Sequence, residues 1–98
     1  MSQPLFKKVA FIGLGLIGSS LARVIVAEKL ATTIVASTRS QKTLEDAKSL
    51  GLIQEGFSDP VEAVKGADLV VLALPVRATQ KVLEQIKPYL SETTIVTD

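Results

Sequence analysis

The stretch that decides the fold reads Val-Ala-Phe-Ile-Gly-Leu-Gly-Leu-Ile-Gly and occupies residues 9–18. Its three glycines have the G-x-G-x-x-G spacing of a dinucleotide-binding turn. Gly13 permits a tight bend, Gly15 leaves room for a pyrophosphate, and Gly18 lets the following helix pack close to the sheet. The pattern predicts a strand, a turn and a helix, with a diphosphate bound at the positive N-terminal end of that helix.

The residues on either side of the glycines support this interpretation. Residues 9–12 form a continuous apolar run typical of a buried strand, and Ile17, Leu21 and Ile25 then recur every four residues, as on one face of a helix. The period therefore changes from strand to helix at the glycines. A glycine turn that binds no ligand remains the alternative.

Composition excludes several classes of function. The chain has 98 residues, enough for one domain, and its net charge of +1 without a basic, aromatic cluster argues against nucleic acid and anionic membranes as partners. Because cysteine and histidine are absent, disulfides and thiolate or zinc sites are excluded, and we expect no metal. No apolar run approaches the roughly 20 residues of a membrane span, and no signal-peptide cleavage site follows residues 9–18, so we expect a cytoplasmic protein.

Strand and helix patterns alternate along the whole chain. The expected strands are 9–12, 32–37, 52–57, 68–74 and 94–97, and the expected helices are 16–29, 41–50, 60–66 and 77–87. This alternation predicts an α/β fold, a doubly wound parallel sheet of the Rossmann type with strand order 3-2-1-4-5 and helices on both faces, giving three αβα layers. The crevice should open between residues 13–18 and Leu74-Pro75-Val76, where the strand order reverses.

The end of the second expected strand predicts which dinucleotide binds. NAD-binding turns usually have an acid about 20 residues beyond the glycines, and here that position is Thr38, with no acid between residues 37 and 41. Arg39 and the hydroxyls of Ser37, Thr38 and Ser40 suit a 2'-phosphate, which a carboxylate would repel. The sequence therefore favours NADP. The alternative is that Arg39 is a solvated charge and Ser40 only a helix cap.

The longer string VAFIGLGLIGSSLA, residues 9–22, resembles the opening of the prephenate and arogenate dehydrogenase family of tyrosine biosynthesis. Similar strings recur at 50–53, 67–76 and 94–98, so the resemblance spans essentially the whole chain. Many members of that family have an acid at the position of Thr38, so this sequence is similar to an NADP-using branch.

The resemblance implies an oxidative decarboxylation of a small cyclohexadienyl substrate, with hydride passing to the nicotinamide. It implies that the backbone N–H groups of Leu16 and Ile17 hold the pyrophosphate and that residues 74–76 line the crevice toward the nicotinamide. Thr79 and Asp98 are weaker candidates, because Thr79 can instead bond to its own helix and Asp98 can be an ordinary loop residue. The candidate cofactor-binding residues are Gly13, Gly15, Leu16, Ile17, Gly18, Ser37, Thr38, Arg39, Ser40, Leu74, Pro75, Val76 and Thr79.

No catalytic residue is expected within this chain, because the family's catalytic histidine would lie beyond Asp98. Residues 1–98 are therefore expected to be a dinucleotide-binding domain, the N-terminal part of a longer enzyme that forms a homodimer through a C-terminal domain. Two alternatives stay open. One is the NADP-binding domain of a related β-hydroxyacid dehydrogenase or imine reductase, and the other is a non-catalytic NADP-sensing module.

Overall fold

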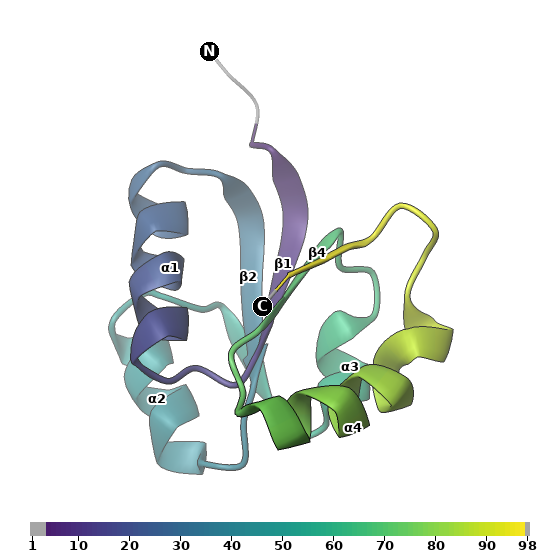
Figure 1. Cartoon of the computed structure of the whole chain (residues 1–98). Coiled ribbons are helices and arrows are strands. Elements are labelled where there is room, and N and C mark those ends of the chain that lie inside the picture. The colour runs from purple at the N-terminus through teal and green to yellow at the C-terminus, as the bar shows by residue number, and fades with distance from the viewer. Residues whose placement is uncertain (1–3, 98) are drawn as a thin grey trace.

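The computed structural model describes residues 4–97, in which strands and helices alternate (Figure 1). The strands are β1 (Phe6–Ile12), β2 (Ala31–Ser37), β3 (Glu55–Phe57), β4 (Leu69–Leu72) and β5 (Ile95–Thr97). The helices are α1 (Leu16–Ala27), α2 (Gln41–Ser49), α3 (Pro60–Val64) and α4 (Val76–Ile86), followed by the short 3-10 turn η1 (Lys87–Tyr89). No helix in residues 4–97 combines the length and the apolar character needed to cross a membrane.

The five strands form one parallel sheet in the order β3-β2-β1-β4-β5, which confirms the predicted topology. Ile12 at the end of β1 lies opposite Ser37 of β2 and Leu72 of β4, so the central strands end together at one edge. The strand order reverses between β1 and β4, which places the glycine turn directly beside the end of β4. This edge of the sheet is where open α/β folds bind their ligands.

Helices cover the two faces of the sheet in pairs, α1 with α2 and α3 with α4 (Figure 1). Side chains of β1 alternate between the two resulting cores. Val9 and Phe11 pack in the cluster with α1 and α2, whereas Ala10 and Ile12 pack in the cluster with α3 and α4. All four are buried, so β1 lies in a sheet that is covered on both faces, the central layer of the predicted three-layer αβα sandwich.

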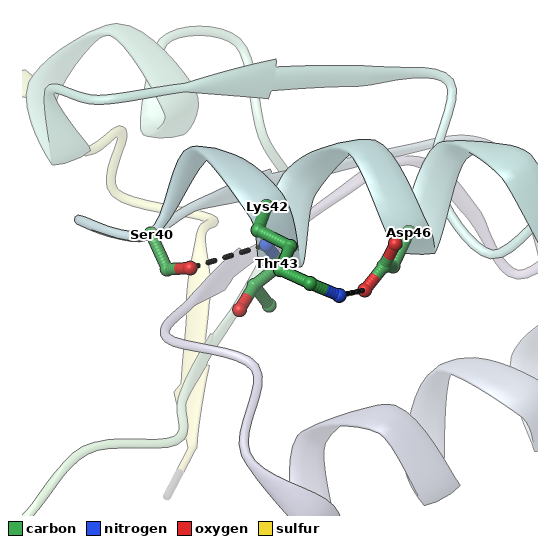
Figure 2. A network of polar contacts seen from close by, with 4 residues as sticks. All are labelled: Ser40, Lys42, Thr43 and Asp46. Carbon is green, nitrogen blue, oxygen red and sulfur yellow. Dashed lines mark hydrogen bonds and ion pairs between the residues drawn. The ribbon is translucent and has the colours of Figure 1, made fainter.

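Local signals in the sequence explain where two of the helices begin. The Ser40 hydroxyl accepts a hydrogen bond from the backbone N–H of Thr43 (3.2 Å) and caps α2 (Figure 2). Asp59 caps α3 in the same way through the N–H of Val61 (2.9 Å), and Pro60 occupies the first turn. Gly51, just after α2, has a φ of +74°, as expected of a C-terminal glycine.

The structure corrects the predicted face of α1. Ile25 is buried, but Leu21, expected on the same apolar stripe, is exposed. Gly18 and Ala22 lie against the sheet in its place. These small residues let α1 approach the strands closely, which leaves a larger side chain at the margin of the contact. The side chains of Leu16 and Ile17 lie outside the described part of the chain.

Several element ends also differ from the prediction. β1 begins at Phe6 rather than at residue 9, and β3 is confined to Glu55–Phe57. Residues 52–54 precede β3 as a turn, because Gln54 takes over the pairing with β2: its side chain accepts a hydrogen bond from the N–H of Ile34 (2.6 Å), and its N–H donates to the Ile34 carbonyl (2.8 Å). Leu52 and Ile53 are nevertheless buried and belong to the core.

Candidate functional site

Gly13 directly follows β1 and has a backbone conformation that only glycine adopts readily. Its φ is +81°, and a Cβ placed there would lie 2.5 Å from the carbonyl oxygen of Ala73 and 2.7 Å from Cδ2 of Leu74. The backbone N–H of Gly13 donates to the Ser37 carbonyl (2.7 Å). The turn is thus fixed to the ends of both neighbouring strands, β2 and β4.

Gly18 and Gly15 differ in their surroundings. A Cβ at Gly18 would lie 3.1 Å from Cβ of Ala73, so this glycine maintains the close approach of α1 to the end of β4. A Cβ at Gly15 would meet nothing within 4 Å. Gly15 is the N-cap residue of α1 and supplies no capping side chain. The first N–H groups of α1 therefore receive no hydrogen bond from a capping side chain, an arrangement that suits an anion.

A cleft with a volume of about 530 Å³ lies at the carboxyl edge of the sheet, between the end of β2 and α4. This volume is within the range of sites for small molecules and cofactors. Its polar lining consists of Ser37, Thr38, Arg39, Ser58 and Gln85, and its apolar lining consists of Ile12, Pro60, Leu74, Ala78 and Val82. Arg39 is the one charged side chain among these residues, so the lining is electropositive.

The last residue of β2 and the two residues after it are predicted site residues that line the cleft. Ser37 is 3% exposed and holds the glycine turn through its carbonyl oxygen. Thr38 follows, with its N–H donating to the Phe57 carbonyl (3.3 Å), and Arg39 is exposed. Together they place two hydroxyls and a guanidinium along one wall of the cleft.

Other predicted residues have different surroundings. Ser40 caps α2 and is not among the lining residues of the cleft, and the Thr79 hydroxyl donates to the Pro75 carbonyl (3.0 Å) in its own helix. Both residues thus make the local hydrogen bonds that were the alternative to cofactor binding, a helix cap for Ser40 and a bond to its own backbone for Thr79. Pro75 and Val76 are exposed at the start of α4, Val76 at 84%, and lie outside the cleft lining. Leu74 does line the cleft, and Asp98 lies outside the described residues.

The sequence did not indicate six of the lining residues, which are Ile12, Ser58, Pro60, Ala78, Val82 and Gln85. Ser58 directly follows β3, and the carboxyl ends of parallel strands share one edge of the sheet. Its position after a predicted strand could therefore have indicated that it lies near the cleft. Ala78 and Val82 resembled a packing stripe, because a helix that forms a cleft wall has the same apolar spacing as one that only covers a core.

Asp68, which is not a lining residue of the cleft, has a lowered pKa. Its carboxylate precedes β4 and accepts hydrogen bonds from the backbone N–H groups of Lys7 (2.8 Å) and Lys8 (2.7 Å). Partial burial acts to raise the pKa of Asp68, but these hydrogen bonds outweigh it, so the pKa lies below its ordinary value. This carboxylate joins β1 to β4 and has a structural role.

Comparison with known proteins places this geometry in context. Residues 8–98 match the family described as NADP oxidoreductase, coenzyme F420-dependent. The chain is similar to a cyclohexadienyl dehydrogenase of Zymomonas mobilis, with 40% identity over 95% of the chain and 32% of that protein. It is also similar to an NAD(P)+ glycerol-3-phosphate dehydrogenase of Rhizobium etli, with 35% identity over 92% of the chain and 31% of that protein. The chain thus spans about a third of the length of these curated relatives.

Two solved structures have the same fold. Prephenate dehydrogenase from Aquifex aeolicus, in complex with hydroxyphenyl propionate and NAD+, superposes with a TM-score of 0.84 and 26% identity over 100% of this chain and 34% of that one. Pyrroline carboxylate reductase from Plasmodium falciparum with NADP bound gives a TM-score of 0.76 and 26% identity over 98% of this chain and 34% of that one. The relatives therefore include proteins with either dinucleotide.

Proposed function

The chain belongs to the family of coenzyme F420-dependent NADP oxidoreductases, and from this premise we propose that it is the NADP-binding domain of a prephenate or arogenate dehydrogenase. The observation that carries the proposal is that the glycine turn before α1 is hydrogen-bonded, through the N–H of Gly13, to Ser37, which lines a cleft with an arginine and no carboxylate among its described lining residues. The turn suits a pyrophosphate, and the cleft suits the phosphorylated ribose.

The residues present fit NADP in size and charge. The N–H groups at the start of α1 would hold the pyrophosphate, with Gly15 leaving its approach open. Thr38 and Arg39 would hold the 2'-phosphate, because a guanidinium forms paired, charge-assisted hydrogen bonds with phosphate oxygens. Leu74 would contact the bound cofactor at the end of β4. When bound, NADP supplies the hydride acceptor, and this chain supplies position and electrostatic stabilisation.

The test is a calorimetric titration of the 98-residue chain with NADP+ and with NAD+ under identical salt conditions. We expect NADP+ to bind about tenfold or more tightly than NAD+, the low end of the 1.5–3 kcal/mol for a charge-assisted hydrogen bond, because Arg39 is exposed. Equal affinities would contradict the assignment of NADP and leave a general dinucleotide site. Binding of neither cofactor would overturn the proposal.

The substrate of the whole protein is proposed from the relatives. Similarity to a cyclohexadienyl dehydrogenase and to a prephenate dehydrogenase supports a cyclohexadienyl substrate such as prephenate or arogenate. We further propose a cytoplasmic homodimer formed through a C-terminal domain. The whole enzyme should reduce NADP+ with one of these two substrates and should not do so with glycerol 3-phosphate.

A second candidate is supported by two of the comparisons. Similarity to a glycerol-3-phosphate dehydrogenase and to a reductase with NADP bound favours another dehydrogenase or reductase with the same cofactor domain. Activity of the whole protein with glycerol 3-phosphate or pyrroline carboxylate, and none with prephenate or arogenate, would favour this candidate. The cofactor site proposed here would then stay unchanged.

A further inference from the structure

The cleft contains a polar group that the proposed function does not use. Gln85 lines the cleft from α4. It lies on the same helical face as Ala78 and Val82, because Val82 is four residues and Gln85 seven residues beyond Ala78. With a rise of 1.5 Å per residue, this face extends about 10 Å along the helix. The wall formed by α4 is therefore apolar over its first turns and ends in a primary amide.

The opposite wall has a different chemistry. Ser37 ends β2, Thr38 and Arg39 follow it, and the three residues present hydroxyls and one cation. If this wall holds the phosphorylated ribose, the base attached to the ribose must occupy the remaining space against α4. Ala78 and Val82 are half-buried and suit the apolar face of a planar ring, which leaves the polar edge of the ring to meet a group further along the helix.

We propose that Gln85 recognises the adenine base of the bound dinucleotide and makes the site selective for adenine; this inference rests on the proposed function. A glutamine amide is complementary to the N6/N7 edge of adenine, because its oxygen accepts from the exocyclic N6 amino group while its NH2 donates to N7. Hypoxanthine has an oxygen in place of that amino group. The amide oxygen would then face a second acceptor, so the hypoxanthine analogue binds less well.

The experiment compares NADP+ with its hypoxanthine analogue, nicotinamide hypoxanthine dinucleotide phosphate, by titration of the 98-residue chain. We expect the unmodified chain to prefer NADP+ by about 5- to 20-fold, the lower part of the range for a paired amide–adenine contact, because Gln85 is exposed. In Gln85→Leu the preference should fall to within about twofold. Gln80→Leu is the matched control, because Gln80 is exposed on the same helix and is not a lining residue of the cleft.

A parallel titration with NAD+ separates the two proposals. Gln85→Leu should keep the preference for NADP+ over NAD+, because Arg39 and not Gln85 faces the 2'-phosphate. Equal affinity of the unmodified chain for the adenine and hypoxanthine cofactors overturns the role of Gln85 and leaves the NADP site intact. An unchanged adenine preference in Gln85→Leu does the same, and the circular dichroism of both variants establishes that they are folded. Failure of the unmodified chain to bind any of the three nucleotides overturns the proposed function and the role of Gln85 together.

Discussion

Arg39 is the residue on which the proposed preference for NADP depends, because it is the one charged side chain among the described residues lining the cleft. Arg39→Ala should weaken binding of NADP+ about tenfold and leave NAD+ binding unchanged, since only NADP+ has the 2'-phosphate that a guanidinium recognises. Calorimetric titration measures both affinities. Arg77→Ala is the control, because Arg77 is exposed on α4 away from the cleft lining. If Arg39→Ala weakened the binding of NADP+ and NAD+ equally, the arginine would contact a part of the cofactor that both share.

Gly15 and Gly13 belong to the same turn, but substitution should affect them differently. Gly15→Val should abolish cofactor binding while the fold survives, because a Cβ there meets nothing within 4 Å and projects into the space a pyrophosphate needs. Gly13→Ala should instead destabilise the fold by more than about 1 kcal/mol, because φ is +81° and the new Cβ would overlap the Ala73 carbonyl. Cofactor titration and thermal unfolding followed by circular dichroism measure the two effects. Unchanged affinity in a folded Gly15→Val variant would make the turn purely structural.

At the scale of elements, Asp68 connects the beginning of β4 to the beginning of β1 through the N–H groups of Lys7 and Lys8. Asp68→Asn should lower the free energy of unfolding by about 1–2 kcal/mol at pH 7, because the amide has one acceptor oxygen: one of the two hydrogen bonds becomes neutral and the other is lost. The folded pKa of Asp68 lies below its unfolded value. Its contribution is therefore complete above about pH 4 and is lost as the pH falls through the folded pKa.

Denaturant unfolding at pH 7 and pH 3 tests this dependence, and the difference between the unmodified chain and Asp68→Asn should shrink at the lower pH. Asp46→Asn is the control. Asp46 pairs with Lys42 on the surface of α2 (3.1 Å, Figure 2), and such a pair contributes about 0.5 kcal/mol or less. A pH-independent effect at Asp68 would show that its packing, and not its charge, is what stabilises the two strands.

The order and type of the elements could be predicted, because periodicity and capping are local properties of the chain. Asp59 and Ser40 cap α3 and α2 where their sequence positions indicated. The residue at which β3 begins could not be predicted, because the side chain of Gln54, and not its backbone, accepts the hydrogen bond from the N–H of Ile34. The α4 wall of the cleft also escaped prediction. Whether Val82 covers a core or lines a cleft depends on how α4 lies against the distant end of β2, which no local pattern specifies.

At the scale of the whole molecule, the chain spans about a third of its curated relatives, and its cleft contains no His or Cys, residues absent from the entire sequence. We expect the 98-residue chain to bind NADP+ and to give no NADPH above background with prephenate or arogenate. Holding two reactants in line contributes about 7–11 kcal/mol toward lowering a barrier, and that requires a surface for the substrate as well as for the cofactor. Absorbance of NADPH measures turnover. Steady turnover by the chain alone would refute this expectation and direct attention to its carboxylates and lysines as bases.

The pairing of β1 with β4 also affects the timing of folding during synthesis. Lys8 and Asp68, which join the two strands, are 60 residues apart in sequence. At about 5–20 residues per second, a ribosome needs roughly 3–12 s to make the intervening chain. Once residue 57 has been made, β1, β2 and β3 can associate with α1 and α2, while the other edge of β1 and one face of the sheet have no partner until α3, β4 and α4 follow. The nascent half-domain therefore exposes Ala10 and Ile12 for seconds, long enough for a chaperone to bind this apolar surface before α3 and α4 cover it.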